Sequence, residues 1–146
     1  MRPHLEFASP AWSPWTEADR AVLEKIQRLE GESYEEKLKE LGLPTLEERR
    51  HQADMLQTFK ILRGIDRVDH STWFQLAAET GRATRSADDP LNLRQKASRL
   101  EVRRHFFSNR VVEAWNLIPS TVKNARKVSA FKKAYKKLRA EMVTPT

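Results

Sequence analysis

The chain has 146 residues, 39% hydrophobic and 32% charged, with a formal net charge of +7 at pH 7, a composition that fits one globular domain with a basic surface. Its lack of cysteine excludes disulfides, thiolate nucleophiles and cysteine-ligated zinc. No apolar run approaches the roughly eighteen residues of a membrane span and no apolar signal core opens the chain. We therefore expect an intracellular protein, nuclear or cytoplasmic, with no membrane association.

Prolines and aromatic residues open the chain at residues 1–15, and the prolines exclude a sustained helix there. We expect Trp12 and Trp15 to anchor this segment on a core, the alternative being that they stack on bases. Capping boxes then predict three helices that end near Gly31, Gly42 and Gly64. The boxes begin at Thr16, Ser33 and Thr45.

Apolar residues at helical spacing identify the helix faces that we expect to be buried. They are Val22, Ile26 and Leu29 in the first helix, and Leu56, Phe59 and Leu62 in the third. A fourth helix is predicted at 71–78, with Trp73, Phe74 and Ala77 facing inward. The periodicity disappears between 81 and 98, where the polar sequence could hold a short β-hairpin that pairs 83–86 with 91–94.

Helix character returns at 100–117, which Pro119 ends, and again at 129–142. The first of these two segments has a wide apolar face made of Phe106, Phe107, Val111, Ala114 and Trp115. The second has a narrower stripe of Phe131, Tyr135, Leu138 and Met142, and basic residues occupy the rest of its surface. One face of this last helix should therefore pack inward while the other presents cations.

These elements predict a mainly α protein, a small helical bundle with a proline-rich N-terminal segment and a short hairpin within 83–94 at most. We divide it into five segments by composition. They are the N-terminal segment 1–15, a helical subdomain 16–78, a polar connection 79–99, a basic helical region 100–142 and a tail 143–146.

Positive charge is concentrated in the last third of the chain. Residues 91–146 contain fourteen Lys and Arg against three Glu, a net charge of +11, whereas residues 1–90 have a net charge of −4. Because phosphates are contacted mainly by Lys and Arg, nucleic acid is the expected partner of the basic end. The open alternative is a solvated basic face that only keeps the protein soluble.

Candidate catalytic residues are sparse. Asp88 and Asp89 are adjacent, as in magnesium sites, but they lie in a polar loop without apolar strands that would fix octahedral geometry. Asp89 before Pro90 is expected to cap a turn instead. The four histidines are scattered, and the sequence has no glycine-rich phosphate loop, serine elbow or kinase motif. We expect no catalytic residue, no metal and no cofactor.

Blocks that resemble one known family follow each other along nearly all of residues 2–142. They are RPHLEFASP at 2–10, WSPW at 12–15, LEKIQR at 23–28, SYEEKL at 33–38, LPTLEERR at 43–50, DM at 54–55, FKIL at 59–62, FFSNRVV at 106–112, Trp115-Asn116, Pro119 and Phe131-Lys132. The ordered set is similar to the thumb and post-thumb region of reverse transcriptases from LINE-type (non-LTR, jockey-like) retrotransposons. Each block alone is weak, whereas the order of the set is specific.

The resemblance implies helices that hold a template–primer duplex through its backbone. In that family the polymerase palm, with its paired-aspartate magnesium strand, lies upstream of the region matched here, and Asp88-Asp89 is not that motif. The family also has a longer basic stretch after the equivalent of Gln27-Arg28, where this chain goes straight to Leu29-Glu30-Gly31. Both departures favour a truncated element fragment without polymerase activity.

The leading interpretation is a non-catalytic reverse transcriptase fragment that binds the backbone of RNA or of an RNA/DNA duplex without sequence preference. Two alternatives stay open: a helical protein-interaction module whose acidic half docks on the basic tail or on a partner, and an expressed transposon relic with no selected function. The residues predicted to contact nucleic acid are Arg103, Arg104, Lys123, Arg126, Lys127, Lys132, Lys133, Lys136 and Lys137.

Overall fold

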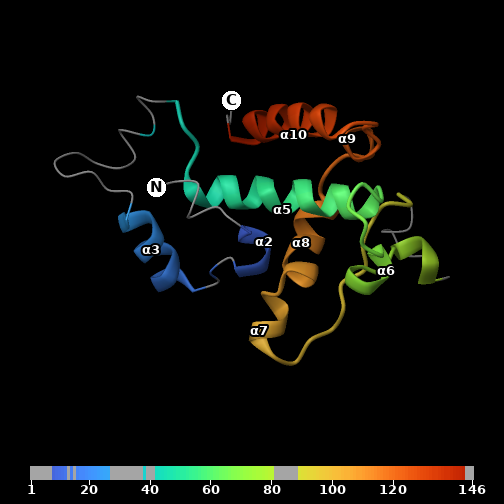
Figure 1. Cartoon of the computed structure of the whole chain (residues 1–146), viewed down its shortest axis with the longest axis horizontal. Coiled ribbons are helices and arrows are strands. Elements are labelled where there is room, and N and C mark those ends of the chain that lie inside the picture. Colours follow the sequence, from blue (N-terminus) through green and yellow to red (C-terminus); the bar gives the residue numbers. More distant parts are fainter. Residues whose placement is uncertain are drawn as a thin grey trace. The chain divides into compact units, whose positions relative to one another are not determined.

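The computed structural model describes residues 8–12, 14, 16–26, 38, 42–80 and 89–143. These residues are mainly helical, as predicted, and no sheet occurs among them (Figure 1). The chain divides into two compact units, Met1–Asp54 and Met55–Thr146. Within the described ranges, every helix is too short or too polar to cross a bilayer.

Helices of the first unit begin at the predicted caps. After the four-residue α2 (Ser9–Trp12), α3 (Glu17–Ile26) begins where the backbone N–H of Asp19 donates to Thr16 Oγ1 at 3.1 Å. Helix α5 (Leu46–Leu62) begins in the same way at Thr45 and continues into the second unit. The predicted helix start at Ser33, together with Leu29 and Gly31, lies outside the described residues.

The prediction that Val22 faces inward is wrong, because its side chain is 58% exposed. Helical spacing identifies the residues that share a face, but it does not say which face another element covers. In α5 the predicted face is nearly right: Phe59 is fully buried, with Met55 beside it, while Leu56 and Leu62 lie at the edge of the core.

Glycines take the left-handed conformation at two of the predicted helix ends. Gly64 has φ +63°, and the N–H of Ile65 donates to the carbonyl of Lys60 at 2.9 Å, the six-to-one hydrogen bond of a Schellman motif. Gly42, with φ +59°, is enclosed by the same kind of bond. A left-handed residue at this position costs a side-chain-bearing amino acid more than glycine, which explains why local sequence locates these ends.

The predicted helix at 71–78 is two short pieces, α6 (His70–Trp73) and the 3-10 helix η1 (Ala77–Thr80). Asp69 caps α6 by accepting from the N–H of Ser71 at 2.9 Å, a bond that lowers the pKa of its carboxyl. Between the pieces the backbone is extended, and Leu76 forms an antiparallel bridge with Leu93. Phe74 and Ala77 are buried, as predicted.

This bridge gives residues 91–94 a different partner from the predicted hairpin. Ala77 N–H donates to the carbonyl of Asn92, and Arg94 N–H donates to that of Gln75, each at 2.8 Å. The other predicted strand, 83–86, lies outside the described residues. The extended backbone of residues 91–94 was therefore predictable. Its observed partner, residues 75–77, lies before the polar stretch in the sequence.

Four helices complete the second unit: α7 (Glu101–Arg104), α8 (Phe107–Asn116), α9 (Ser120–Lys123) and α10 (Val128–Val143). The segment predicted as one helix over 100–117 is broken at Phe106, which has φ −64° and ψ 144°. Phe106 is 40% exposed rather than inward. Helix α8 ends before Pro119, as predicted, and the short helix α9, which was not predicted, begins directly after it.

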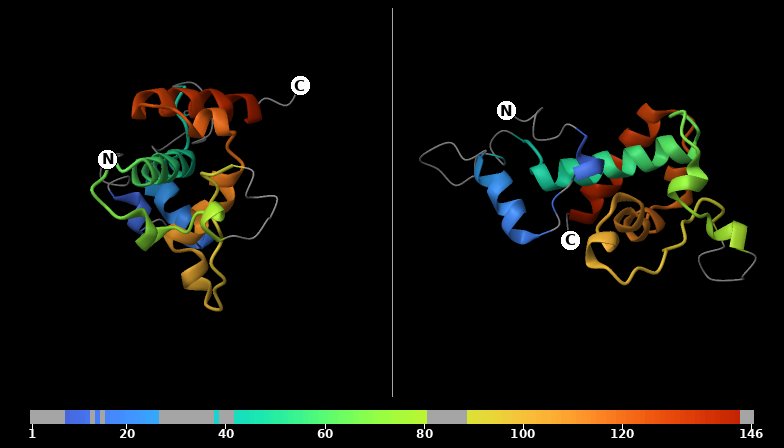
Figure 2. Two further views of the ribbon diagram at one scale, coloured as in Figure 1. Left: turned by 90° about the vertical axis from the view of Figure 1, so that its right-hand side faces the viewer. Right: turned by 60° about the horizontal axis from the view of Figure 1, so that its bottom comes forward.

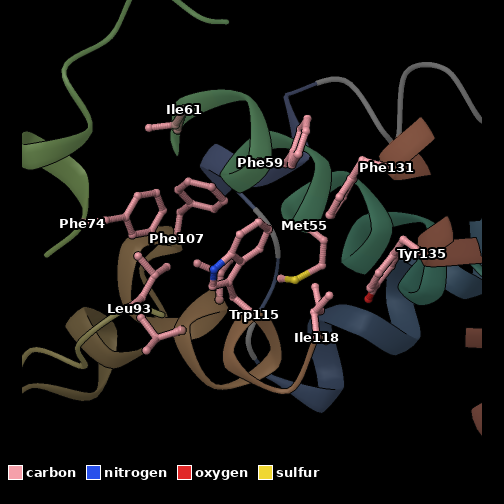
Figure 3. Close-up of a cluster of buried hydrophobic side chains, with 12 residues drawn as sticks. Met55, Phe59, Ile61, Phe74, Leu93, Phe107, Trp115, Ile118, Phe131 and Tyr135 are labelled. Carbon is pink, nitrogen blue, oxygen red and sulfur yellow. The ribbon is translucent and has the colours of Figure 1, made fainter. Parts of the chain in front are cut away.

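An aromatic cluster centred on Phe131 forms the core of the second unit (Figure 3). The ring of Phe131 stacks on that of Phe59 with centroids 4.3 Å apart, and it lies 5.9 Å from both Trp115 and Tyr135. This core joins residues from the predicted 16–78 subdomain to the predicted 100–142 region. Met142, predicted in the stripe, is 55% exposed because the buried stripe ends at Leu138.

Trp115 is 1% exposed, as predicted, and its replacement tests the core. Trp115→Ala removes the indole that packs beside Phe131, so we expect the free energy of unfolding to fall by about 3–5 kcal/mol. Leu117→Ala is the matched control, since Leu117 is 70% exposed and should change stability little. Chemical denaturation measures both; equal stabilities would contradict this placement of the core.

Candidate nucleic-acid interface

Helix α10 has one buried face and one cationic face. Its buried side chains are Phe131 and Tyr135, with Leu138 partly buried beside them. At about 100° per residue, position 133 lies nearly opposite this stripe, 136 and 137 lie on either side of 133, and 132 lies about a quarter-turn from the stripe. The lysines at these four positions are all exposed, so the packing of the core orients them outward.

The turn between α9 and α10 extends this cationic face. Arg126 and Lys127 are exposed immediately before α10 begins. The end of α9 is held in place because Arg63 Nη2 donates to the carbonyl of Lys123 at 3.0 Å and to Asn124 Oδ1 at 3.3 Å. We call the residues Arg126, Lys127, Lys132, Lys133, Lys136 and Lys137 the α10 cationic face.

Ion pairing neutralises little of this face. Lys137 Nζ lies 3.9 Å from Glu141 Oε1, with 81% and 63% of the two side chains exposed. An exposed pair one helical turn apart contributes only about 0.3–0.5 kcal/mol and leaves the ammonium accessible. The face therefore remains available to a phosphate backbone.

Lys123, predicted among the binding residues, is in the interior. Its side chain is 1% exposed, and its ammonium lies 3.1 Å from Asp89 Oδ2 and 2.6 Å from Asn92 Oδ1. The same Nζ lies 5.9 Å from the centroid of the Trp115 ring. A buried ammonium with these partners cannot reach a phosphate, so Lys123 is not part of the α10 cationic face.

Segment 89–94, which meets Lys123, is held by side chains as well as by its backbone bridge to residues 75–77. Asp89 Oδ1 accepts from the N–H of Leu91 at 3.0 Å, which confirms its predicted turn-capping role. Trp115 Nε1 donates to the carbonyl of Leu91, and the amide of Asn116 both donates to and accepts from Leu93, all at 2.8 Å. No local sequence pattern predicts these bonds, since the partners are far apart in the chain.

Arg103 and Arg104, also predicted to bind, are exposed on α7 but lie away from the α10 cationic face. Helices α7 and α10 are at opposite ends of α8 (Figure 1; Figure 2, left). The two arginines belong instead with three exposed cations that the prediction missed, in the aperiodic segment before α7. They are Arg94, Lys96 and Arg99. The predicted site is thus two separate cationic surfaces and one buried lysine.

The described residues contain no cluster of three or more His, Asp or Glu that could hold a metal. Both carboxylate oxygens of Asp89 are engaged, one by a backbone N–H and the other by Lys123. A cation at this carboxylate would have to displace a buried ammonium.

No protein-family model matches the chain, nor does any curated protein or solved structure. The interface is defined by its own geometry: a helix with a buried aromatic stripe and exposed lysines on the remaining surface.

Lys123→Ala tests the structural role of the buried lysine. It leaves the Asp89 carboxylate, 14% exposed, without its cation, and we expect a loss of about 3 kcal/mol in the free energy of unfolding. Lys133→Ala removes the same charge from an exposed position and should cost less than about 0.5 kcal/mol. Thermal and urea unfolding compare the two, and similar stabilities would rule out a structural role for Lys123.

Proposed function

We propose that this chain is a non-catalytic nucleic-acid-binding module related to the thumb and post-thumb region of LINE-type reverse transcriptases. The α10 cationic face contacts the phosphate backbone of RNA or of an RNA/DNA duplex, without reading bases. The observation that carries this proposal is the split of α10 into a buried aromatic stripe and an exposed lysine surface.

Charge supports the same interpretation. Besides Lys123, residues 120–143 contain seven basic residues and a single acid, Glu141. Contacts of exposed ammonium groups with phosphates release counterions, which gives strong and sequence-independent binding at low salt. A duplex backbone presents phosphates at regular spacing along its axis, and a straight helix with cations on successive turns suits such a ligand.

A second candidate is the protein-interaction module, which the uneven charge favours. Residues 1–90 have a net charge of −4 against +11 in the rest, so an acidic segment could occupy the basic face. Competition tests whether the two ligands share a surface. Duplex RNA displaces an acidic peptide from the α10 cationic face only if both bind the same lysines.

Replacing Lys132, Lys133, Lys136 and Lys137 together by Gln tests the proposal. Gln has a helix propensity similar to that of Lys and the four positions avoid the buried stripe, so the fold should persist. We expect weaker duplex binding at every sequence, and a logarithmic salt slope flatter by roughly one unit for each phosphate that the variant no longer neutralises. Fluorescence anisotropy over a salt series measures both quantities.

Matched double variants separate position from net charge: Lys133→Gln with Lys137→Gln on the α10 cationic face, and, as the control, Lys25→Gln with Arg67→Gln outside both cationic surfaces. A local binding face predicts that the control variant keeps a slope close to that of the wild type. If both double variants lost affinity equally, only net charge would matter. If neither did, the α10 cationic face would not be the binding surface.

We expect no polymerase or nuclease activity with any divalent metal. Of the two adjacent aspartates, Asp89 is committed to Lys123 and to a turn, and two-metal chemistry needs both carboxylates on the ions. Primer-extension and nuclease assays with magnesium or manganese check this. Template-dependent incorporation that Asp88→Ala abolishes would overturn the expectation.

A further inference from the structure

Helix α7 turns into α8 at the end of α8 away from α10 (Figure 1). Aromatic and cationic side chains meet at this turn. The rings of Trp73 and Phe106 are parallel within 5°, with centroids 6.1 Å apart. The guanidinium of Arg103 lies 5.4 Å from the centroid of Phe106. We call Trp73, Arg103 and Phe106 the stacked corner; its residues play no part in the α10 cationic face.

Two buried residues of α8 hold the stacked corner in place. The side chain of Asn109, 5% exposed, donates from Nδ2 to the carbonyl of Arg103 at 2.8 Å and so ties α7 to α8. The ring of Phe107, which is buried, meets Trp73 edge-on at 6.2 Å. Groups held this way lose little conformational freedom when a ligand binds.

Phe106 is open to a ligand. Its extended backbone at the start of α8 leaves the side chain 40% exposed, although an aromatic ring gains more by full burial. Trp73 and the guanidinium of Arg103 both lie over the ring of Phe106, so the exposed part of the ring is what these two groups leave uncovered. A further planar group can stack on the exposed guanidinium of Arg103 and meet the uncovered part of the ring.

The segment of chain that leads into the corner is rich in exposed cations, which are complementary to phosphates. Residues 94–104 contain five exposed basic side chains and one acidic residue, Glu101. Arg104 is partly fixed, since its Nε donates to the carbonyl of Ser98 at 3.2 Å. An exposed ring with cations along the chain beside it is the combination that single-stranded nucleic acid uses: bases stack on the ring while phosphates meet the cations.

We propose that the stacked corner is a binding site for unpaired bases of single-stranded nucleic acid. The proposal rests on the proposed function in assuming a nucleic-acid ligand, and it adds a base contact on a second surface. The neighbouring exposed side chains of Leu100 and Val102 would also suit an apolar protein partner. The parallel stack and the guanidinium above it favour a planar, polyanionic ligand, because both ring and guanidinium present flat faces.

The test compares two single strands of about twelve nucleotides, a length within the range such sites cover. One is an oligothymidylate, and the other has the same phosphates on base-free sugars. At one fixed salt concentration we expect the full chain to bind the base-bearing strand at least about five-fold more tightly, which corresponds to the low end of base–aromatic stacking. Phe106→Leu should abolish this preference, because leucine keeps apolar contact with Trp73 but has no ring. Thermal melting checks that the variant is folded.

Leu100→Ala, at the N-cap of α7, and Val102→Ala, within α7, are matched controls and should keep the preference for bases. A wild-type chain that binds both strands equally, or a Phe106→Leu variant that keeps the preference, overturns the proposal. Binding of an acidic amphipathic peptide that Leu100→Ala weakens and Phe106→Leu does not would assign the corner to a protein partner and overturn it too. Duplex RNA is measured in parallel: duplex binding without base preference refutes this inference alone, whereas no binding to any strand refutes the proposed function.

Discussion

A buried cation, Lys123, determines how the second unit is assembled. An ammonium removed from water must be compensated by partners at close range, and here these are Asp89 and Asn92. Both partners lie in segment 89–94, so the requirement fixes that segment against α9. Trp115 and Asn116 then add bonds from α8, and Leu93 is brought to its bridge with Leu76. The connection before α7 is thereby ordered without a sheet.

The basic residues of this chain consequently serve different purposes that composition cannot separate. Lys123 holds the interior, and Arg63 fixes the turn before α10. The lysines on the outer side of α10 are exposed to solvent, so their side chains do not contribute to the core. Arg103 is intermediate, because it lies over the ring of Phe106 while remaining exposed. A +11 region thus contains a smaller set of cations that a ligand can reach.

Features that depend on neighbouring residues were predictable from the sequence, and features that depend on distant partners were not. The start of α3 at Thr16 and the end of α5 at Gly64 follow from local hydrogen bonding and backbone freedom. The burial of Lys123 depends on Asp89, thirty-four positions away, and no residue near Lys123 in the sequence indicates that it is buried. At Phe106 the apolar residues keep helical spacing although the backbone is extended, so one helix was predicted where there are two. Periodicity reports the spacing of side chains in the sequence and not the backbone conformation. The outward lysines of α10 were predicted correctly because the stripe of Phe131 and Tyr135 is strong enough to set the helix orientation.

The central position of Phe131 has a consequence for synthesis on the ribosome. The ring that Phe59 and Trp115 pack against belongs to the last helix of the chain, so it emerges after both of these residues. A second unit without this helix leaves the rings of Phe59 and Trp115 without their contact with Phe131. The helix that closes this core is also the one that presents the lysines. Completion of folding and appearance of the cationic surface are therefore a single event.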